Sequence, residues 1–134
     1  MRIAGIHHHS VCVTDLERSR AFYRDVLGLR EIPAPPSFAR SVAWFALGDQ
    51  QLHLLTAAAA DAPGARHVAL HVDDVAAAAG DLASRGLPVE QAPPIPGAER
   101  VFTHDPDGNR IELIHWSRPW DDTARELGLP PVAR

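Results

Sequence analysis

The stretch HVALHVDDV at residues 67–75 repeats the pattern of HHSVCVTDL at residues 8–16, 59 positions earlier. In both stretches a histidine starts a run of alternating side chains, which is the period of a β-strand. An aspartate suited to cap a helix follows in each case. At this offset His8 aligns with His67. The repeat therefore predicts two copies of one structural module in tandem.

Each half continues with the same series of elements, β-α-β-β-β. Thr14 and Glu17 form a possible capping box for the first helix, and Asp73 or Asp74 can cap the second. The turn DPDG at residues 105–108 joins the last two strands. The predicted strands are residues 6–13, 29–33, 41–47 and 51–56 in the first half, and residues 67–72, 87–91, 100–104 and 110–115 in the second.

The composition limits the classes of function. With 134 residues the chain has the length of one compact domain. A net charge of −4 gives no basic surface for nucleic acid and no polybasic membrane signal. No apolar stretch is long enough to span a bilayer. A single cysteine fits a reducing compartment, so we expect a cytoplasmic protein. A small-molecule substrate is a separate expectation.

Two pairs of possible metal ligands have the same internal spacing. His8 and His53 are 45 residues apart, and so are His67 and Glu112. Strand alternation places each of them on the face opposite the apolar residues that should pack beneath the helices. Because a buried carboxylate is costly without a compensating cation, we predict one divalent metal ion bound by these four residues. Three imidazoles and one carboxylate suit Zn, Ni, Co, Fe or Mn.

A lone histidine on a strand is more often a surface or hydrogen-bonded residue than a metal ligand, and the symmetry of the four positions reverses this preference. Nearby positions could line a substrate pocket, although core packing explains Trp44 equally well. These pocket candidates are Ser10, Cys12, Trp44, His71 and Arg110. The DPDG turn has a sufficient structural role and is assigned no chemistry.

These residues also carry a resemblance to a known family. The chain resembles the vicinal oxygen chelate superfamily, which includes glyoxalase I, fosfomycin-resistance proteins, extradiol dioxygenases, methylmalonyl-CoA epimerases and bleomycin-binding proteins. The matching segments are IHHHSVCVTDLERSRAFYRDVLGL at 6–29, LHLL at 52–55, HVALHVDDV at 67–75 and FTHDPDGNRIELI at 102–114.

The resemblance implies an α+β fold with two tandem βαβββ modules that form a curved, partly open eight-stranded sheet around a central metal site. We expect one domain over residues 1–134, with module one at about 1–57, module two at about 66–116 and a C-terminal tail at 117–134. The family's short members commonly complete their sites by pairing modules, which implies a homodimer. Whether modules pair within one chain or between two is left open.

The resemblance also implies a chemistry. It favours a glyoxalase I-like lyase or isomerase that works through a metal-stabilised enediolate, with Glu112 as the catalytic base. His53 stands where glyoxalase I of this type has a carboxylate, and this departure argues against the standard reaction. An extradiol dioxygenase using His8, His67 and Glu112, or a fosfomycin-resistance transferase, is the alternative enzyme. A metal-free drug-binding protein is the alternative from another class.

Overall fold

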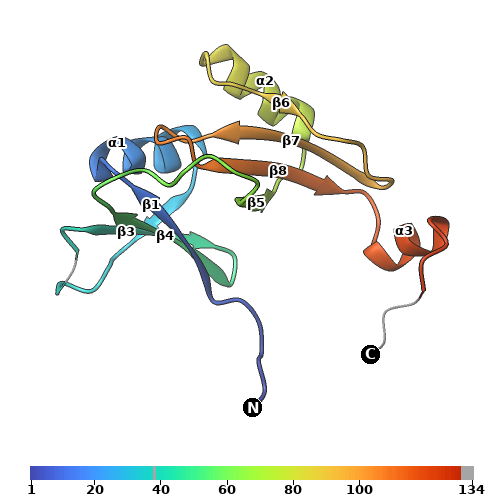
Figure 1. The fold of residues 1–134 in the computed structure, drawn as a ribbon, viewed down its shortest axis with the longest axis horizontal. Coiled ribbons are helices and arrows are strands. Elements are labelled where there is room, and N and C mark those ends of the chain that lie inside the picture. The colour runs from blue at the N-terminus through green and yellow to red at the C-terminus, as the bar shows by residue number, and fades with distance from the viewer. Residues whose placement is uncertain (38, 131–134) are drawn as a thin grey trace. The chain divides into compact units, whose positions relative to one another are not determined.

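The computed structural model describes residues 1–37 and 39–130, and the chain within them divides into two units. The first unit contains residues 1–66 together with 104–110, and the second contains 67–103 and the chain from Ile111 onward. Figure 1 shows the helices and strands of both units coloured along the chain. The first unit contains predicted module one together with the last hairpin turn of module two, and the second unit contains the rest of module two and the chain that follows it.

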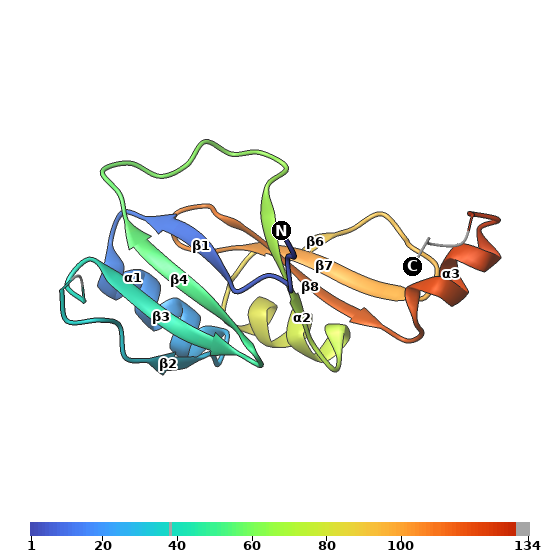
Figure 2. The same cartoon turned by 90° about the horizontal axis from the view of Figure 1, so that it is seen from below.

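The first unit contains a four-stranded sheet in the order β1-β4-β3-β2. Strand β1 runs parallel to β4, and β3 is antiparallel to both β4 and β2. Val13, Phe45 and Leu54 form part of the buried face of this sheet, and α1 packs against β3 and β4 (Figure 2). The strands are β1 (His8–Val13), β2 (Arg30–Ile32), β3 (Val42–Leu47) and β4 (Gln50–Thr56).

The first helix begins one residue later than the predicted capping box. Helix α1 (Leu16–Ala21) is capped by Asp15, whose side chain accepts a hydrogen bond from the backbone N–H of Arg18 at 3.0 Å. It continues as the π-helical segment η1 (Phe22–Val26). The capping box of Thr14 and Glu17 was therefore wrong, because Asp15 occupies the capping position and Thr14 has another partner.

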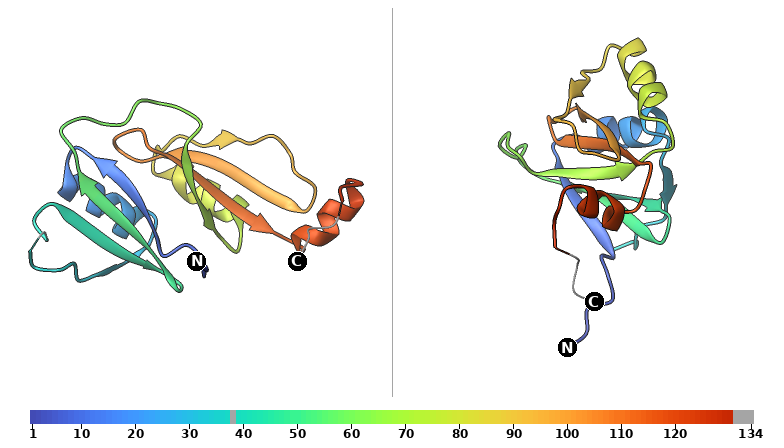
Figure 3. Two further views of the ribbon diagram at one scale, coloured as in Figure 1. Left: turned by 60° about the horizontal axis from the view of Figure 1, so that its bottom comes forward. Right: turned by 90° about the vertical axis from the view of Figure 1, so that its right-hand side faces the viewer.

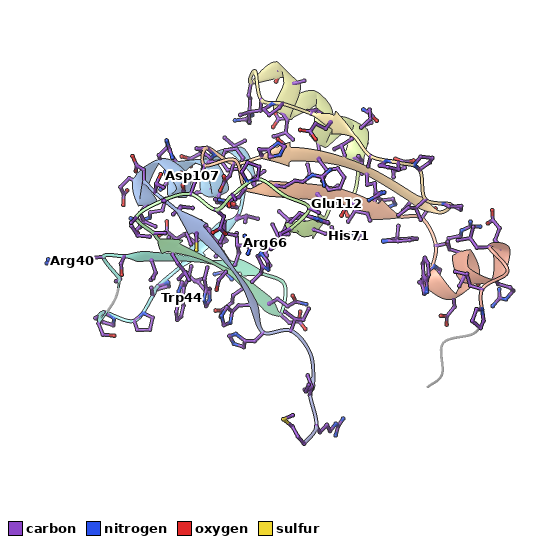
Figure 4. All side chains as sticks on the ribbon, in the orientation of Figure 1. Arg40, Trp44, Arg66, His71, Asp107 and Glu112 are labelled. Carbon is purple, nitrogen blue, oxygen red and sulfur yellow. The ribbon has the colours of Figure 1, made fainter. Side chains whose placement is uncertain are left out.

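That partner is Asp107 in the hairpin turn, although Thr14 and Asp107 are 93 residues apart in the sequence. The backbone N–H and the hydroxyl of Thr14 donate to the Asp107 carboxylate at 3.0 and 2.5 Å, and Arg18 donates to it at 2.9 Å. Figure 4 shows Asp107 beside α1. The turn therefore joins the first helix to the rest of its unit.

Asp105 in the same turn is the centre of a buried network. Its carboxylate accepts hydrogen bonds from the hydroxyl of Tyr23 at 3.0 Å and from the side-chain amide of Asn109 at 2.8 Å. Its other oxygen accepts backbone N–H groups of Asp107 and Asn109, both at 2.9 Å. Burial raises the pKa of Tyr23, and the negative charge of Asp105 raises it further, so the phenol stays protonated and donates.

The second unit repeats the arrangement of the first, with strand order β5-β8-β7-β6 (Figure 3). Asp74 caps its helix by accepting from the backbone N–H of Ala77 at 2.8 Å, as predicted. Val75 and Leu82 are the buried residues of this helix. The elements are β5 (His67–His71), α2 (Val75–Ser84), β6 (Glu90–Gln91), β7 (Ala98–His104) and β8 (Arg110–Trp116).

The tandem βαβββ modules and the α+β class are confirmed. Among the described residues the strands are hydrogen-bonded as two sheets of four rather than as one continuous ladder of eight. The C-terminal tail contains a helix that the sequence did not predict, α3 (Trp120–Glu126). Residues 131–134 of the tail lie outside the described part of the chain. None of the helices described is long and apolar enough to cross a bilayer.

Candidate functional site

In the first module, β1 and β4 bring the two predicted histidine ligands together. The ring of His8 stacks on the ring of His53, with centroids 4.1 Å apart and planes 16° apart. The indole of Trp44 also stacks on the ring of His53, with centroids 4.2 Å apart and planes 4° apart. Strand pairing explains this contact, because Trp44 lies directly opposite His53 on neighbouring strands. His53 is thus fixed by an aromatic ring and is 6% exposed.

Hydrogen bonds orient both imidazoles of this pair. Nε2 of His53 lies 2.8 Å from Oε1 of Gln51, and Nδ1 of His8 lies 2.9 Å from Nδ1 of His7. If Nε2 of His53 carries the hydrogen that Gln51 accepts, the lone pair is on Nδ1. Burial lowers the pKa of His53, and His8 and His7 lower it further, which favours the neutral ring that a metal ligand requires.

In the second module, β5 and β8 bring His67 and Glu112 together in the same way. Nε2 of His67 lies 2.9 Å from Oε2 of Glu112. The Glu112 side chain is only 7% exposed, whereas that of His67 is 31% exposed. Figure 4 shows Glu112 on β8. A carboxylate this well buried requires cationic or hydrogen-bonding partners.

Arg100 supplies the second partner of Glu112, and the sequence analysis missed it. Nη1 of Arg100 lies 3.1 Å from Oε1 of Glu112. Nε and Nη2 of the same guanidinium donate to the carbonyl oxygen of Pro93 at 3.2 and 2.8 Å. Strand alternation could have indicated this partner. It places Arg100 and Phe102 on one face of β7, and β7 forms a hairpin with β8, the strand that carries Glu112.

The chemistry of these pairs fits a divalent cation. When two ligand atoms each lie 2.0–2.2 Å from one ion and make a right angle at that ion, they are about 3 Å from each other. The nitrogen of His67 and the oxygen of Glu112 are 2.9 Å apart, so a cation could replace the proton between them. The described residues contain no group of three or more His, Cys, Asp or Glu side chains placed to hold a metal ion. Each module contains one pair of ligand-type side chains, His8 with His53 and His67 with Glu112.

The predicted pocket residues have different surroundings. Trp44 is half-buried in the stack on His53, and Ser10 is exposed on β1 opposite His53. Cys12 is half-buried, and its carbonyl oxygen accepts from the side chain of Asn109. His71 is exposed, and its ring lies 5.6 Å from that of His115. Arg110 is half-buried at the start of β8.

The family model described as Glyoxalase/Bleomycin resistance protein/Dioxygenase superfamily matches residues 5–113. The chain belongs to this superfamily. The resemblance carried by the two repeated segments is thereby confirmed, and the matched region contains both ligand pairs and Arg100. The matched superfamily includes proteins with different activities, so membership does not assign a substrate.

Relatives within the superfamily have two different named activities. Lactoylglutathione lyase of Salmonella typhimurium is 34% identical over 136 residues, covering 90% of this chain and 96% of the relative. Mitochondrial methylmalonyl-CoA epimerase of Mus musculus is 32% identical over 130 residues, covering 84% and 73%. A glyoxalase family protein from Bacillus anthracis has a TM-score of 0.79 at 29% identity, covering 87% and 98%.

Proposed function

We propose that this protein is a metal-dependent, glyoxalase-like lyase or isomerase that moves a proton at a carbon beside a carbonyl group. The observation that carries the proposal is the buried carboxylate of Glu112, held between His67 at 2.9 Å and Arg100 at 3.1 Å. A carboxylate fixed in a water-poor environment is suited to act as a general base. The named activities of the two relatives support an enzyme of this class.

The proposed ligands of one divalent cation are His8, His53, His67 and Glu112. Their support is the repeated pairing of two ligand-type side chains in each module. When bound, the cation supplies Lewis-acid stabilisation of negative charge on a substrate oxygen. Elemental analysis of the purified protein distinguishes among Zn, Ni, Co, Fe and Mn.

Glu112 then performs the proton transfer. Its carboxylate accepts the proton from the substrate C–H, and the C–H electron pair becomes the C=C bond of an enediolate while the carbonyl oxygen takes the negative charge. The resulting carboxylic acid returns the proton to the former carbonyl carbon. The hydroxyl proton of the first carbon moves to the oxygen that took the charge, so the first carbon becomes the new carbonyl group. This cycle leaves Glu112 ionised again and isomerises the substrate without an oxidant.

His53 has a different role from Glu112. A neutral imidazole that binds a cation cannot easily accept a second proton, so we assign His53 as a permanent ligand. Trp44 and Gln51 hold its ring, which supports a fixed position. The site therefore has one carboxylate base instead of two, and a substrate acidic enough for a single base is expected.

Metal analysis tests the ligand set. We expect one divalent ion per wild-type chain by elemental analysis of untagged protein, and a loss of about 10-fold or more in affinity on replacing any one ligand by alanine. His9→Ala is the matched control, because His9 neighbours His8 but lies on the opposite side of the strand. Negligible metal in the wild-type protein would refute the metal-dependent mechanism.

We propose that the protein forms a homodimer, the commonest closed arrangement of identical chains. Light scattering at micromolar concentration checks this, and a monomer would contradict it.

Mixing His8→Ala with Glu112→Ala chains decides whether one metal site takes its two ligand pairs from one chain or from two. If one site takes its pairs from two chains, the mixture recovers one intact site per dimer, whereas it recovers none if each site uses one chain.

A further inference from the structure

We propose that Arg100 is a positioning residue that holds one oxygen of Glu112 and leaves only the other for a metal ion and substrate. The inference rests on the proposed function, since it takes Glu112 as ligand and base. Oε1 of Glu112 lies 3.1 Å from Nη1 of Arg100, while Oε2 lies 2.9 Å from Nε2 of His67. The two oxygens of one carboxylate therefore have different partners within the same unit.

Arg100 is itself held in place. Two more of its nitrogens donate to the carbonyl oxygen of Pro93, so all three nitrogens of the guanidinium have an acceptor. Its side chain is 16% exposed. A planar guanidinium with three fixed nitrogens cannot turn to follow a moving carboxylate. Arg100 therefore acts as a fixed point for Oε1 of Glu112.

Phe102 supports both partners of Glu112. The guanidinium carbon of Arg100 lies 5.8 Å from the centre of the Phe102 ring, within the range of a cation–π contact. The ring of His67 meets Phe102 edge-on, with centroids 5.3 Å apart and planes 87° apart. One aromatic ring thus orients the groups that bind the two oxygens of the carboxylate.

This arrangement has a chemical consequence for the proposed reaction. A carboxylate that binds a metal ion through both oxygens must break a metal–oxygen bond before it can accept a proton. The contact between Arg100 and Oε1 limits Glu112 to one bond to the metal ion. It also keeps the carboxylate in place when that bond breaks. The positive charge of Arg100 also opposes cation binding nearby. Arg100 therefore favours proton transfer over tight metal binding.

Cobalt binding tests this division. We expect Arg100→Gln to bind Co²⁺ at least as tightly as the wild type and to change its visible absorption spectrum, because the second oxygen of Glu112 becomes available to the ion. We expect kcat to fall by about 10- to 100-fold, measured with the best substrate from a panel of hemithioacetals and thioesters. Arg85→Gln, which removes an exposed pair with Asp81, is the matched control and should change neither property.

Two further variants separate positioning from general stability. Arg100→Lys keeps the charge but has one nitrogen in place of the three that contact Pro93 and Glu112. Its Co²⁺ spectrum should therefore shift in the same direction by a smaller amount, even if Arg100→Gln fails to fold. In a Glu112→Gln background, Arg100→Gln should reduce kcat no further, because it acts through that carboxylate.

An unchanged Co²⁺ spectrum in folded Arg100 variants would overturn the inference and leave the proposed function intact. Weaker Co²⁺ binding with an equal loss of kcat and a lower melting temperature would also overturn it, since that pattern indicates a structural role. Failure of the wild-type protein to bind Co²⁺ would overturn both proposals together.

Discussion

The indole of Trp44 lies parallel to the imidazole of His53, with ring centroids 4.2 Å apart and planes 4° apart. The proposed metal ligand is therefore in direct contact with a fluorophore. A paramagnetic ion such as Ni²⁺ or Co²⁺ bound to His53 should quench the fluorescence of Trp44.

Fluorescence titration with Ni²⁺ checks this contact. We expect saturable quenching in the wild-type protein and its loss in Trp44→Phe. Trp120→Phe is the control, because Trp120 lies on α3 at 45% exposure and contacts Trp116 instead. Equal quenching in Trp44→Phe would place the ion away from His53.

Replacing Glu112 by glutamine should lower turnover sharply while the protein stays folded. General acid–base catalysis contributes about 10²- to 10⁴-fold, so we expect kcat to fall by that factor. Metal retained by the variant separates loss of the base from loss of the ion. Exchange of the substrate C–H with deuterium from solvent reports the proton transfer. Wild-type turnover by metal-loaded Glu112→Gln would rule out Glu112 as the base.

The substitution His53→Glu tests why the standard carboxylate is absent. A glutamate at this position restores a second carboxylate, so we expect metal binding to persist and turnover of a hemithioacetal to rise. His53→Gln, which matches glutamate in size and adds no base, is the control. If the two variants turn over the hemithioacetal equally, the second carboxylate is not what limits this activity.

The Asp107 carboxylate should make stability depend on pH in the acid range. Its burial raises its pKa, but hydrogen bonds from Thr14 and Arg18 outweigh this, and the pKa is lowered overall. Such a group stabilises the fold above its unfolded pKa of about 3.9, and this contribution is lost as pH falls through the lower folded pKa.

Urea unfolding of Asp107→Asn checks this expectation. We expect a loss of about 2 kcal/mol at neutral pH and a weaker dependence of stability on pH below about 4. The control is Asp25→Asn, whose exposed pair with Arg24 also lowers the pKa of Asp25 but should stabilise the protein little. Identical pH profiles for Asp107→Asn and wild type would contradict the assignment.

The ligand pairs could be predicted because local patterns encode them. Strand alternation uses only neighbouring residues, and the repeat compares two such local patterns 59 positions apart. The structure places His8 with His53 and His67 with Glu112. Their convergence on one ion stays a prediction. The helix α3 was missed because its seven residues are few and its apolar residues are scattered.

The groups that surround the carboxylates could not be predicted in this way. In the sequence Arg100 looks like any charged residue at the start of a strand, and its three acceptor contacts form only when Pro93 and Glu112 come together. The contact of Tyr23 with Asp105 spans 82 residues. The DPDG turn was explained as a hairpin signal alone, although its two carboxylates also hold the first helix.

The hairpin turn at residues 104–110, which belongs to the first unit, limits how this protein can be divided. A fragment cut after Arg66 would lack both Asp105 and Asp107, so the Tyr23 hydroxyl would be buried without its acceptor. Such a fragment should fold poorly, and a synthetic peptide of residues 98–116 should restore its structure.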